Sequence, residues 1–183
     1  TLTALNECVN LLDLREPYSE SYNQSVERAR HYLKSEYYER YGKSARAKVT
    51  CVGHTHIDIA WLWPIRQTRE KALRSFATVL ELMRRYPEYK FFSSQPILYE
   101  MVKEKAPEVY GEIKERVAEG RWEPEGAMWV EADCNLIGGE SMVRQILFGK
   151  KFFADEFGIE SHILWLPDVF GYSAAMPQIL TLS

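Results

Sequence analysis

Three potential metal ligands stand at every second position of one short segment. The segment Gly53-His54-Thr55-His56-Ile57-Asp58 carries two imidazoles and one carboxylate. Because side chains of an extended chain alternate between faces, His54, His56 and Asp58 can all point the same way. Imidazole nitrogen and carboxylate oxygen together suit zinc or a similar divalent ion. A polar loop with a turn-capping Asp58 is the alternative, and for a cluster of three we favour the metal site.

Alternating strands and helices must position these ligands. Residues Lys48–Val52 are short and β-branched, which predicts a buried strand with Cys51 as a small core residue. Further extended segments are predicted over Tyr89–Ser93, Arg121–Glu123, Ala127–Val130 and His162–Leu166, and helices over Ile65–Arg85, Pro96–Lys105, Pro107–Gly120 and Glu140–Phe157. This alternation predicts an α/β fold with a parallel sheet. Functional residues of such folds collect at the carboxyl ends of strands, so His56, Asp58, Asp133 and Asp168 are expected to converge.

The N-terminal residues follow a different pattern. An apolar stripe at helical spacing between Tyr18 and Tyr41 predicts a helix that ends near Gly42, and Leu2–Leu14 predicts an earlier one. Residues Lys43–Lys48 read as a short basic connector. We therefore predict a helical segment over residues 1–47 and an α/β domain over residues 48–183. Nothing in the first segment suggests chemistry, and His31 is expected to be an exposed helical residue.

Three blocks of the sequence, in this order, carry a resemblance to a known family. They are His54-Thr55-His56-Ile57-Asp58 with Trp61, then Trp129-Val130-Glu131-Ala132-Asp133, then Trp165-Leu166-Pro167-Asp168-Val169-Phe170-Gly171-Tyr172-Ser173. The blocks resemble segments of the family-38 glycoside hydrolases, the α-mannosidases. The members of that family are considerably longer. The chain therefore resembles the N-terminal portion of one, and it begins with Thr1 rather than Met.

The resemblance implies a fold and a set of roles. It implies that the chain is part of a parallel β/α barrel-like catalytic domain. It makes His56 and Asp58 zinc ligands, and it makes Asp133 both the catalytic nucleophile and a further zinc contact. Trp61 would stack on a sugar ring, whereas core packing is the alternative for it and our choice for Trp63.

The resemblance leaves the roles of several residues open. His54 would line the pocket or hydrogen-bond to a ligand, because the family gives the metal to the second histidine. Asp168 would contact substrate or brace the site, although a turn-capping role is about equally expected beside Pro167 and Gly171. Asp133 has a similar alternative as a loop carboxylate that caps the following segment. Cys134 beside it could be a thiol ligand, but we favour a bystander role.

The implied activity is that of a retaining, zinc-dependent α-mannosidase that removes terminal α-linked mannose from oligosaccharides. Such an enzyme needs a nucleophile and a separate acid/base. The resemblance places the acid/base and a further zinc-binding histidine beyond residue 183. Glu125 and Glu131 are nearby carboxylates, but nothing in the sequence selects either. The isolated chain is therefore expected to be inactive or nearly so, and cobalt or another divalent ion could replace zinc.

Two other functions remain open. A zinc hydrolase of the polysaccharide deacetylase type would also use His and Asp at strand ends, but it usually shows a His-x-x-x-His pair. The four histidines, His31, His54, His56 and His162, never fall at that spacing. A non-catalytic carbohydrate- or metal-binding module is the other alternative. Presence of Asp133 argues mildly against it.

Composition limits the partners and the compartment. The net charge of -3 and the pI near 5.9 give no reason to propose nucleic acid or an anionic membrane. No apolar stretch approaches the ~20 residues that span a bilayer. Three cysteines, Cys8, Cys51 and Cys134, form no Cys-x-x-Cys pair, which favours a reduced, cytoplasmic setting. A mannose-containing oligosaccharide is the expected partner, and the sequence leaves a homo-oligomer open.

Overall fold

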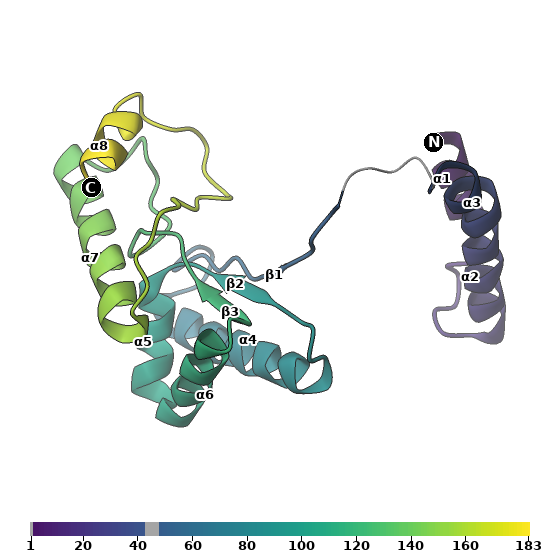
Figure 1. Cartoon of the computed structure of the whole chain (residues 1–183), viewed down its shortest axis with the longest axis horizontal. Helices are drawn as coiled ribbons and strands as arrows, with labels where there is room; N and C mark the ends of the chain where they lie inside the picture. Colours follow the sequence, from purple (N-terminus) through teal and green to yellow (C-terminus); the bar gives the residue numbers. More distant parts are fainter. Residues whose placement is uncertain (1, 43–47) are drawn as a thin grey trace. The chain divides into compact units, whose positions relative to one another are not determined.

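The chain divides into two compact units. The computed structural model describes residues 2–42 and 48–183, and the units are Thr1–Thr50 and Cys51–Ser183 (Figure 1). Most of the predicted basic connector, residues 43–47, lies outside the described residues.

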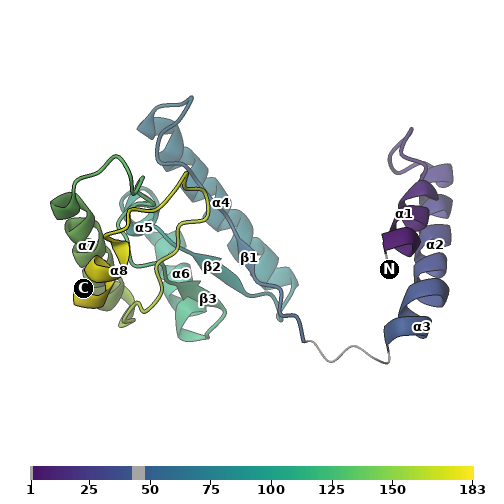
Figure 2. The same ribbon diagram turned by 90° about the horizontal axis from the view of Figure 1, so that it is seen from above.

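The first unit is a helical hairpin. Helix α1 spans Leu2–Asn10 and α2 spans Glu20–Leu33; the π-helical turn η1 (Lys34–Tyr38) and the short α3 (Glu39–Tyr41) continue α2 (Figure 2). Ser19 caps α2, because its hydroxyl oxygen accepts the N–H of Tyr22 at 3.2 Å. Gly42 is the C-terminal cap of α3. Both helices expected in this part of the chain are therefore confirmed.

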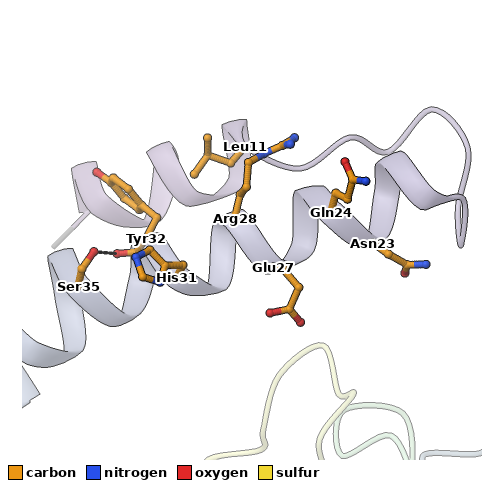
Figure 3. A pocket seen from close by; sticks show the side chains of 8 residues that line it. All are labelled: Leu11, Asn23, Gln24, Glu27, Arg28, His31, Tyr32 and Ser35. Atoms are coloured by element: carbon orange, nitrogen blue, oxygen red, sulfur yellow. Dashed lines mark hydrogen bonds between the residues drawn. The ribbon is translucent and has the colours of Figure 1, made fainter.

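An open hollow lies on this hairpin (Figure 3). Its lining residues are Leu11, Asn23, Gln24, Glu27, Arg28, His31, Tyr32 and Ser35. His31 is exposed, as expected, and the hydroxyl of Ser35 donates to the Tyr32 carbonyl at 3.2 Å. The lining shows no pairing of a nucleophile with a base and no cluster of metal ligands.

The second unit is built on a small parallel sheet. Its elements are β1 (Gly53–His54), α4 (Ile65–Arg85), β2 (Phe91–Ser93), α5 (Pro96–Lys105), α6 (Pro107–Ala118), β3 (Trp122–Pro124), α7 (Gly139–Phe157) and α8 (Met176–Leu182). The strand order is β1-β2-β3, and Phe91 lies opposite Gly53 on one side and Trp122 on the other. Helices α4, α5 and α6 connect the strands and lie close to the sheet (Figure 1). The predicted mixed α/β fold with a parallel sheet is confirmed, and the described residues form three strands rather than a closed barrel.

Helix boundaries follow local sequence signals. Pro96 and Pro107 open α5 and α6, where a missing N–H costs nothing. Gly158 ends α7 with a φ of 69°, a left-handed conformation that favours glycine. The guanidinium of Arg121 donates to the carbonyls of Met83 and Tyr86 at the end of α4, at 2.7 and 2.9 Å. These helices therefore begin and end close to where the sequence predicts.

An aromatic core joins the helices to the sheet. Phe76 from α4, Tyr99 from α5 and Trp122 from β3 are almost fully buried against one another. The Trp122 indole donates to the Tyr99 hydroxyl at 2.9 Å, and that hydroxyl donates to the Ser93 carbonyl at 2.9 Å. Burying one such side chain stabilises the fold by about 1.5–3 kcal/mol. The core thus gives the carboxyl ends of the strands a rigid support.

The predicted buried strand over Lys48–Val52 is wrong. Only Gly53 and His54 pair with β2, and Val49 and Cys51 are exposed. The first ladder hydrogen bond runs from the Gly53 N–H to the Lys90 carbonyl at 2.9 Å. β1 lies at the edge of the sheet, and a β-branched sequence there has no second strand to pair with among the described residues.

Two other predicted strands are also corrected. Residues 127–130 form bends, and Ala127 has a φ of 63°. Within His162–Leu166 only Leu164 makes a bridge, to Gly126. The reason is a carboxylate: Glu125 Oε1 accepts the N–H groups of His162 and Ile163, both at 2.9 Å, in place of a strand partner.

The described helices include none that is both long enough and apolar enough to cross a membrane.

Candidate metal centre

Two predicted ligands and one more distant carboxylate come together after β1. His56 Nε2 lies 3.2 Å from Asp58 Oδ1 and 3.6 Å from Asp168 Oδ2. One ligand atom from each of the three side chains lies within 4.8 Å of the others, and within residues 2–42 and 48–183 this is the one such group of three. His56, Asp58 and Asp168 therefore converge as predicted, although Asp168 follows an isolated bridge rather than a strand.

A buried carboxylate orients His56. Glu131 Oε2 lies 2.7 Å from His56 Nδ1, and the Glu131 side chain is only 6% exposed. Its other oxygen accepts a hydrogen bond from the Ser94 hydroxyl at 2.5 Å. Glu131 Oε2 has no hydrogen-bond partner of good geometry among the described residues, so its contact with the imidazole is electrostatic. A carboxylate at this distance favours the imidazole proton on Nδ1, with Nε2 unprotonated beside Asp58 and Asp168.

Glu131 itself is held in an unfavourable electrostatic position. Burial raises the pKa of its carboxyl, while the Ser94 hydroxyl and His56 act in the opposite direction. Sequence reasoning noted this residue but gave it no role. The sequence feature that could have identified Glu131 is a charged residue between the apolar Val130 and Ala132, two positions before Asp133.

His54 does not share the ligand face. Its Nδ1 lies 3.1 Å from the Phe92 carbonyl, and its Nε2 accepts the indole N–H of Trp165 at 3.3 Å. Its ring packs against both Phe92 and Trp165 at 5.3 Å. The alternation expected for an extended strand fails here because β1 ends at His54. His54 thus fastens the end of β1 to the segment that precedes Asp168.

Asp133 lies outside the group of three and forms a local turn. Its Oδ1 accepts the N–H groups of Asn135 and Leu136 at 2.8 and 3.0 Å. Its Oδ2 makes no hydrogen bond within the described part of the chain. Cys134 is buried, and its thiol donates to the Ala132 carbonyl at 3.6 Å. The turn holds the Asp133 carboxylate in one orientation but does not bring it to His56.

The two tryptophans after the ligands differ in their surroundings. Trp61 is 68% exposed and meets Trp63 edge-on at 5.6 Å. Trp63 is anchored: its indole donates to the Thr68 hydroxyl at 3.1 Å, and Lys71 Nζ lies 4.0 Å from its ring centroid. Trp63 therefore fixes the loop to α4, whereas most of the Trp61 side chain is exposed to solvent.

The donor set fits a divalent cation. One imidazole nitrogen and two carboxylates match the ligand types that zinc takes in proteins. Asp58 and Asp168 would repel each other at this separation, and a cation between them would remove that repulsion. Ile57, between two of the ligands, is buried in the apolar core, which limits movement of the segment.

Comparisons with known proteins identify relatives of the chain. Residues 46–183 match the model of the "Glycosyl hydrolases family 38 N-terminal domain". The chain is 42% identical to human "Alpha-mannosidase 2C1" over 98% of its length and 41% identical to "Alpha-mannosidase G" of Dictyostelium discoideum over 96%. It spans only 16% of either relative.

A solved structure gives the same result for the fold. An alpha-mannosidase from Enterococcus faecalis V583 superposes on 72% of this chain with a TM-score of 0.65 and 28% sequence identity, and the match covers 15% of that protein. The family resemblance predicted from three sequence blocks is therefore confirmed, and the chain belongs to the glycosyl hydrolases of family 38, with residues 46–183 matching the N-terminal domain of that family.

Proposed function

We propose that the chain supplies the metal-binding and nucleophile-bearing part of a retaining α-mannosidase. The substrate would be a glycan or oligosaccharide with terminal α-linked mannose. The proposal is supported by the family and by relatives whose names describe alpha-mannosidases. The observation that carries it is the group His56, Asp58 and Asp168 at the carboxyl end of the parallel sheet.

His56 Nε2 and Asp58 would hold the metal, which we propose to be zinc, with cobalt as an alternative. The family resemblance adds Asp133 as a ligand, and the geometry adds Asp168. Bound zinc would act as a Lewis acid that holds two adjacent sugar hydroxyls and orients the ring. Glu131 would keep His56 in the tautomer that can bind.

Asp133 would be the nucleophile. Its carboxylate would attack the anomeric carbon and form the glycosyl-enzyme bond as the leaving oxygen takes a proton from an acid/base elsewhere in the protein. The turn at Asn135 and Leu136 fixes one carboxylate oxygen and so reduces the orientational freedom lost on attack. We propose that the acid/base and a further histidine ligand lie beyond residue 183.

Other residues would shape the sugar site. The exposed ring of Trp61 would stack on the apolar face of mannose. His54 would hold the pocket wall through Trp165. We further propose that the three strands belong to a larger β/α barrel and that the protein works in the cytoplasm. The second point rests on the three cysteines, all of them free.

A zinc titration tests the metal assignment. Calorimetry at neutral pH would compare the wild-type chain with His56→Ala, Asp133→Asn and Asp168→Asn. His31→Ala and Asp155→Asn are controls, because both residues are exposed and neither belongs to the group of His56, Asp58 and Asp168. We expect His56→Ala to abolish measurable binding and the controls to match wild type. The two site aspartates are compared with each other: the weaker binder of the two variants identifies the stronger third ligand.

A turnover assay tests the chemistry. We expect no hydrolysis of an aryl α-mannoside by the 183-residue chain, with or without zinc, because we propose that the acid/base lies elsewhere in the protein. In the longer protein, Asp133→Asn is expected to abolish turnover while it leaves folding intact. Normal turnover by that variant would remove Asp133 from the mechanism. Unchanged zinc binding in His56→Ala would overturn the metal site.

A further inference from the structure

We infer that Gln95 is a positioning residue that ties the metal-binding segment to the residue that orients His56. Its amide Nε2 donates to the Ile57 carbonyl at 2.9 Å, and its Oε1 accepts the Glu131 N–H at 3.1 Å. Gln95 is 2% exposed, so both hydrogen bonds are shielded from water. The part of the inference that concerns zinc rests on the proposed metal site.

The two ends of this link are specific. Ile57 lies between the ligands His56 and Asp58, and Glu131 contacts the imidazole of His56. Ser94, the residue before Gln95, donates to the Glu131 carboxylate at 2.5 Å. Two adjacent residues of the β2–α5 turn therefore hold Glu131, Ser94 at its side chain and Gln95 at its backbone.

The backbone of Gln95 supports a demanding role for its side chain. Gln95 has a φ of 60° and a ψ of 82°, in the left-handed region that glycine occupies readily and glutamine rarely. Non-glycine residues keep such conformations where the surroundings over-determine them, and they cluster at functional sites. The following Pro96 restricts this residue further.

The β2–α5 turn also packs closely against Gly126, in the segment that leads to Glu131. A Cβ added to Gly126, which has a φ of 125°, would meet the Ser94 Cβ at 2.8 Å. The β2–α5 turn is thereby pressed against the segment that leads to Glu131. We therefore expect a shift of Gln95 to move the backbone at Ile57 and at Glu131, because close packing leaves little space for other side chains to compensate.

The test uses a matched pair of variants. Gln95→Met keeps the length of the side chain but removes both hydrogen bonds. Gln145→Met is the control, because Gln145 accepts the N–H of Val130, the residue before Glu131, at 2.9 Å but does not reach Ile57. Amide hydrogen exchange and zinc titration would be measured on both chains.

Reciprocal changes in exchange are expected. Gln95→Met should speed exchange of the Glu131 N–H about tenfold and leave the Val130 N–H unchanged, and Gln145→Met should do the opposite. Gln95→Met should also weaken zinc binding at least tenfold, as loss of an outer-shell partner does. The control should change it less than threefold.

A glycine variant separates the side chain from the backbone. Gln95→Gly fits the left-handed conformation and so protects folding, but it lacks the amide. We expect it to weaken zinc binding as Gln95→Met does. Wild-type affinity in Gln95→Gly, or equal affinity in the Gln95→Met and Gln145→Met variants, would overturn the positioning role.

Failure of the proposed metal site would look different. In that case the wild-type chain would bind no zinc, whereas the link would still be judged by exchange. Faster exchange at Glu131 in Gln95→Met alone supports the link without the metal. Unchanged exchange at Glu131 overturns it whatever the zinc titration shows.

Discussion

The aromatic core and the candidate metal centre lie on the same sheet but are built on opposite principles. In the core, Tyr99 and Trp122 are buried and their polar atoms have partners. At the centre, Asp58 and Asp168 approach the same nitrogen of His56, and a buried Glu131 contacts the other. The core contributes stability. At the centre the carboxylates of Asp58 and Asp168 repel each other, and a bound cation would remove that repulsion. Stability and function therefore depend on different residues of one small unit.

The largest expected effect breaks the core. Trp122→Ala should lower the free energy of unfolding by about 3–5 kcal/mol, because it removes a fully buried indole and leaves a cavity beside Phe76 and Tyr99. Urea unfolding followed by circular dichroism would measure the change. Trp61→Ala is the matched control, and its exposed ring should make it cost less than about 0.5 kcal/mol. Equal losses would mean that the two regions do not differ as described.

The next effect separates binding from stability. Glu131→Gln should weaken zinc binding about 10- to 100-fold, because His56 loses the carboxylate that fixes its tautomer. The same change removes a buried charge, so the metal-free chain should be no less stable than wild type. Calorimetry and urea unfolding on the same samples would check both. A large loss of metal-free stability would assign Glu131 to the core rather than to the centre.

A smaller effect concerns pH and the outer surface of the core. Lys103 beside Glu156 lowers the pKa of that carboxyl to about 2, with help from Tyr110 and Lys114 and against partial burial. The ordinary value is 4.5, so the unfolded chain takes up the proton first as pH falls. The stability from this group is present above about pH 4.5 and is lost between about pH 4.5 and 2.

Glu156→Gln tests that assignment. The variant should lose about 1 kcal/mol at pH 7, a value reduced for solvent screening of these partly exposed side chains. It should also show a shallower decline of stability below pH 4.5 than wild type, measured by urea unfolding at several pH values. Parallel curves for the two chains would show that Glu156 carries none of the acid sensitivity.

The smallest expected effect concerns Cys51, whose reactivity tests whether the segment before β1 is exposed. Cys51 is exposed, whereas Cys8 and Cys134 are buried, so a thiol reagent should modify Cys51 first and at least about tenfold faster. Cys51→Ser should change the free energy of unfolding by less than about 0.5 kcal/mol. Mass spectrometry of the modified cysteine would identify the site. Slow modification of Cys51 would restore the buried strand that its sequence suggested.

Short-range signals in the sequence were sufficient for much of the fold. Proline at the first turn and glycine after the last one placed α5, α6 and α7 within a few residues. The spacing of His54, His56 and Asp58 suggested three ligands, and two of them, His56 and Asp58, belong to the candidate centre. Such signals depend on residues only a few positions apart, so they do not require knowledge of the tertiary structure.

Strand length and partner choice needed the tertiary structure. The residues 48–52 have strand composition, yet pairing begins only at Gly53, because strands form where a neighbour offers backbone groups. The position of His54 also depends on the tertiary structure. Its ring contacts Phe92 and Trp165, which hold it away from His56 and Asp58.

By itself the sequence determined the family and the parallel α/β plan, and it suggested His56 and Asp58 as a ligand pair. The tertiary structure alone decided that Asp133 lies outside the group that Asp168 joins, that Glu131 contacts His56 and that Gln95 links the two segments. These residues are separated by tens of positions, and no periodicity relates them. Their proximity is set by where the strands end and by how the turns pack, which are properties of the assembled sheet.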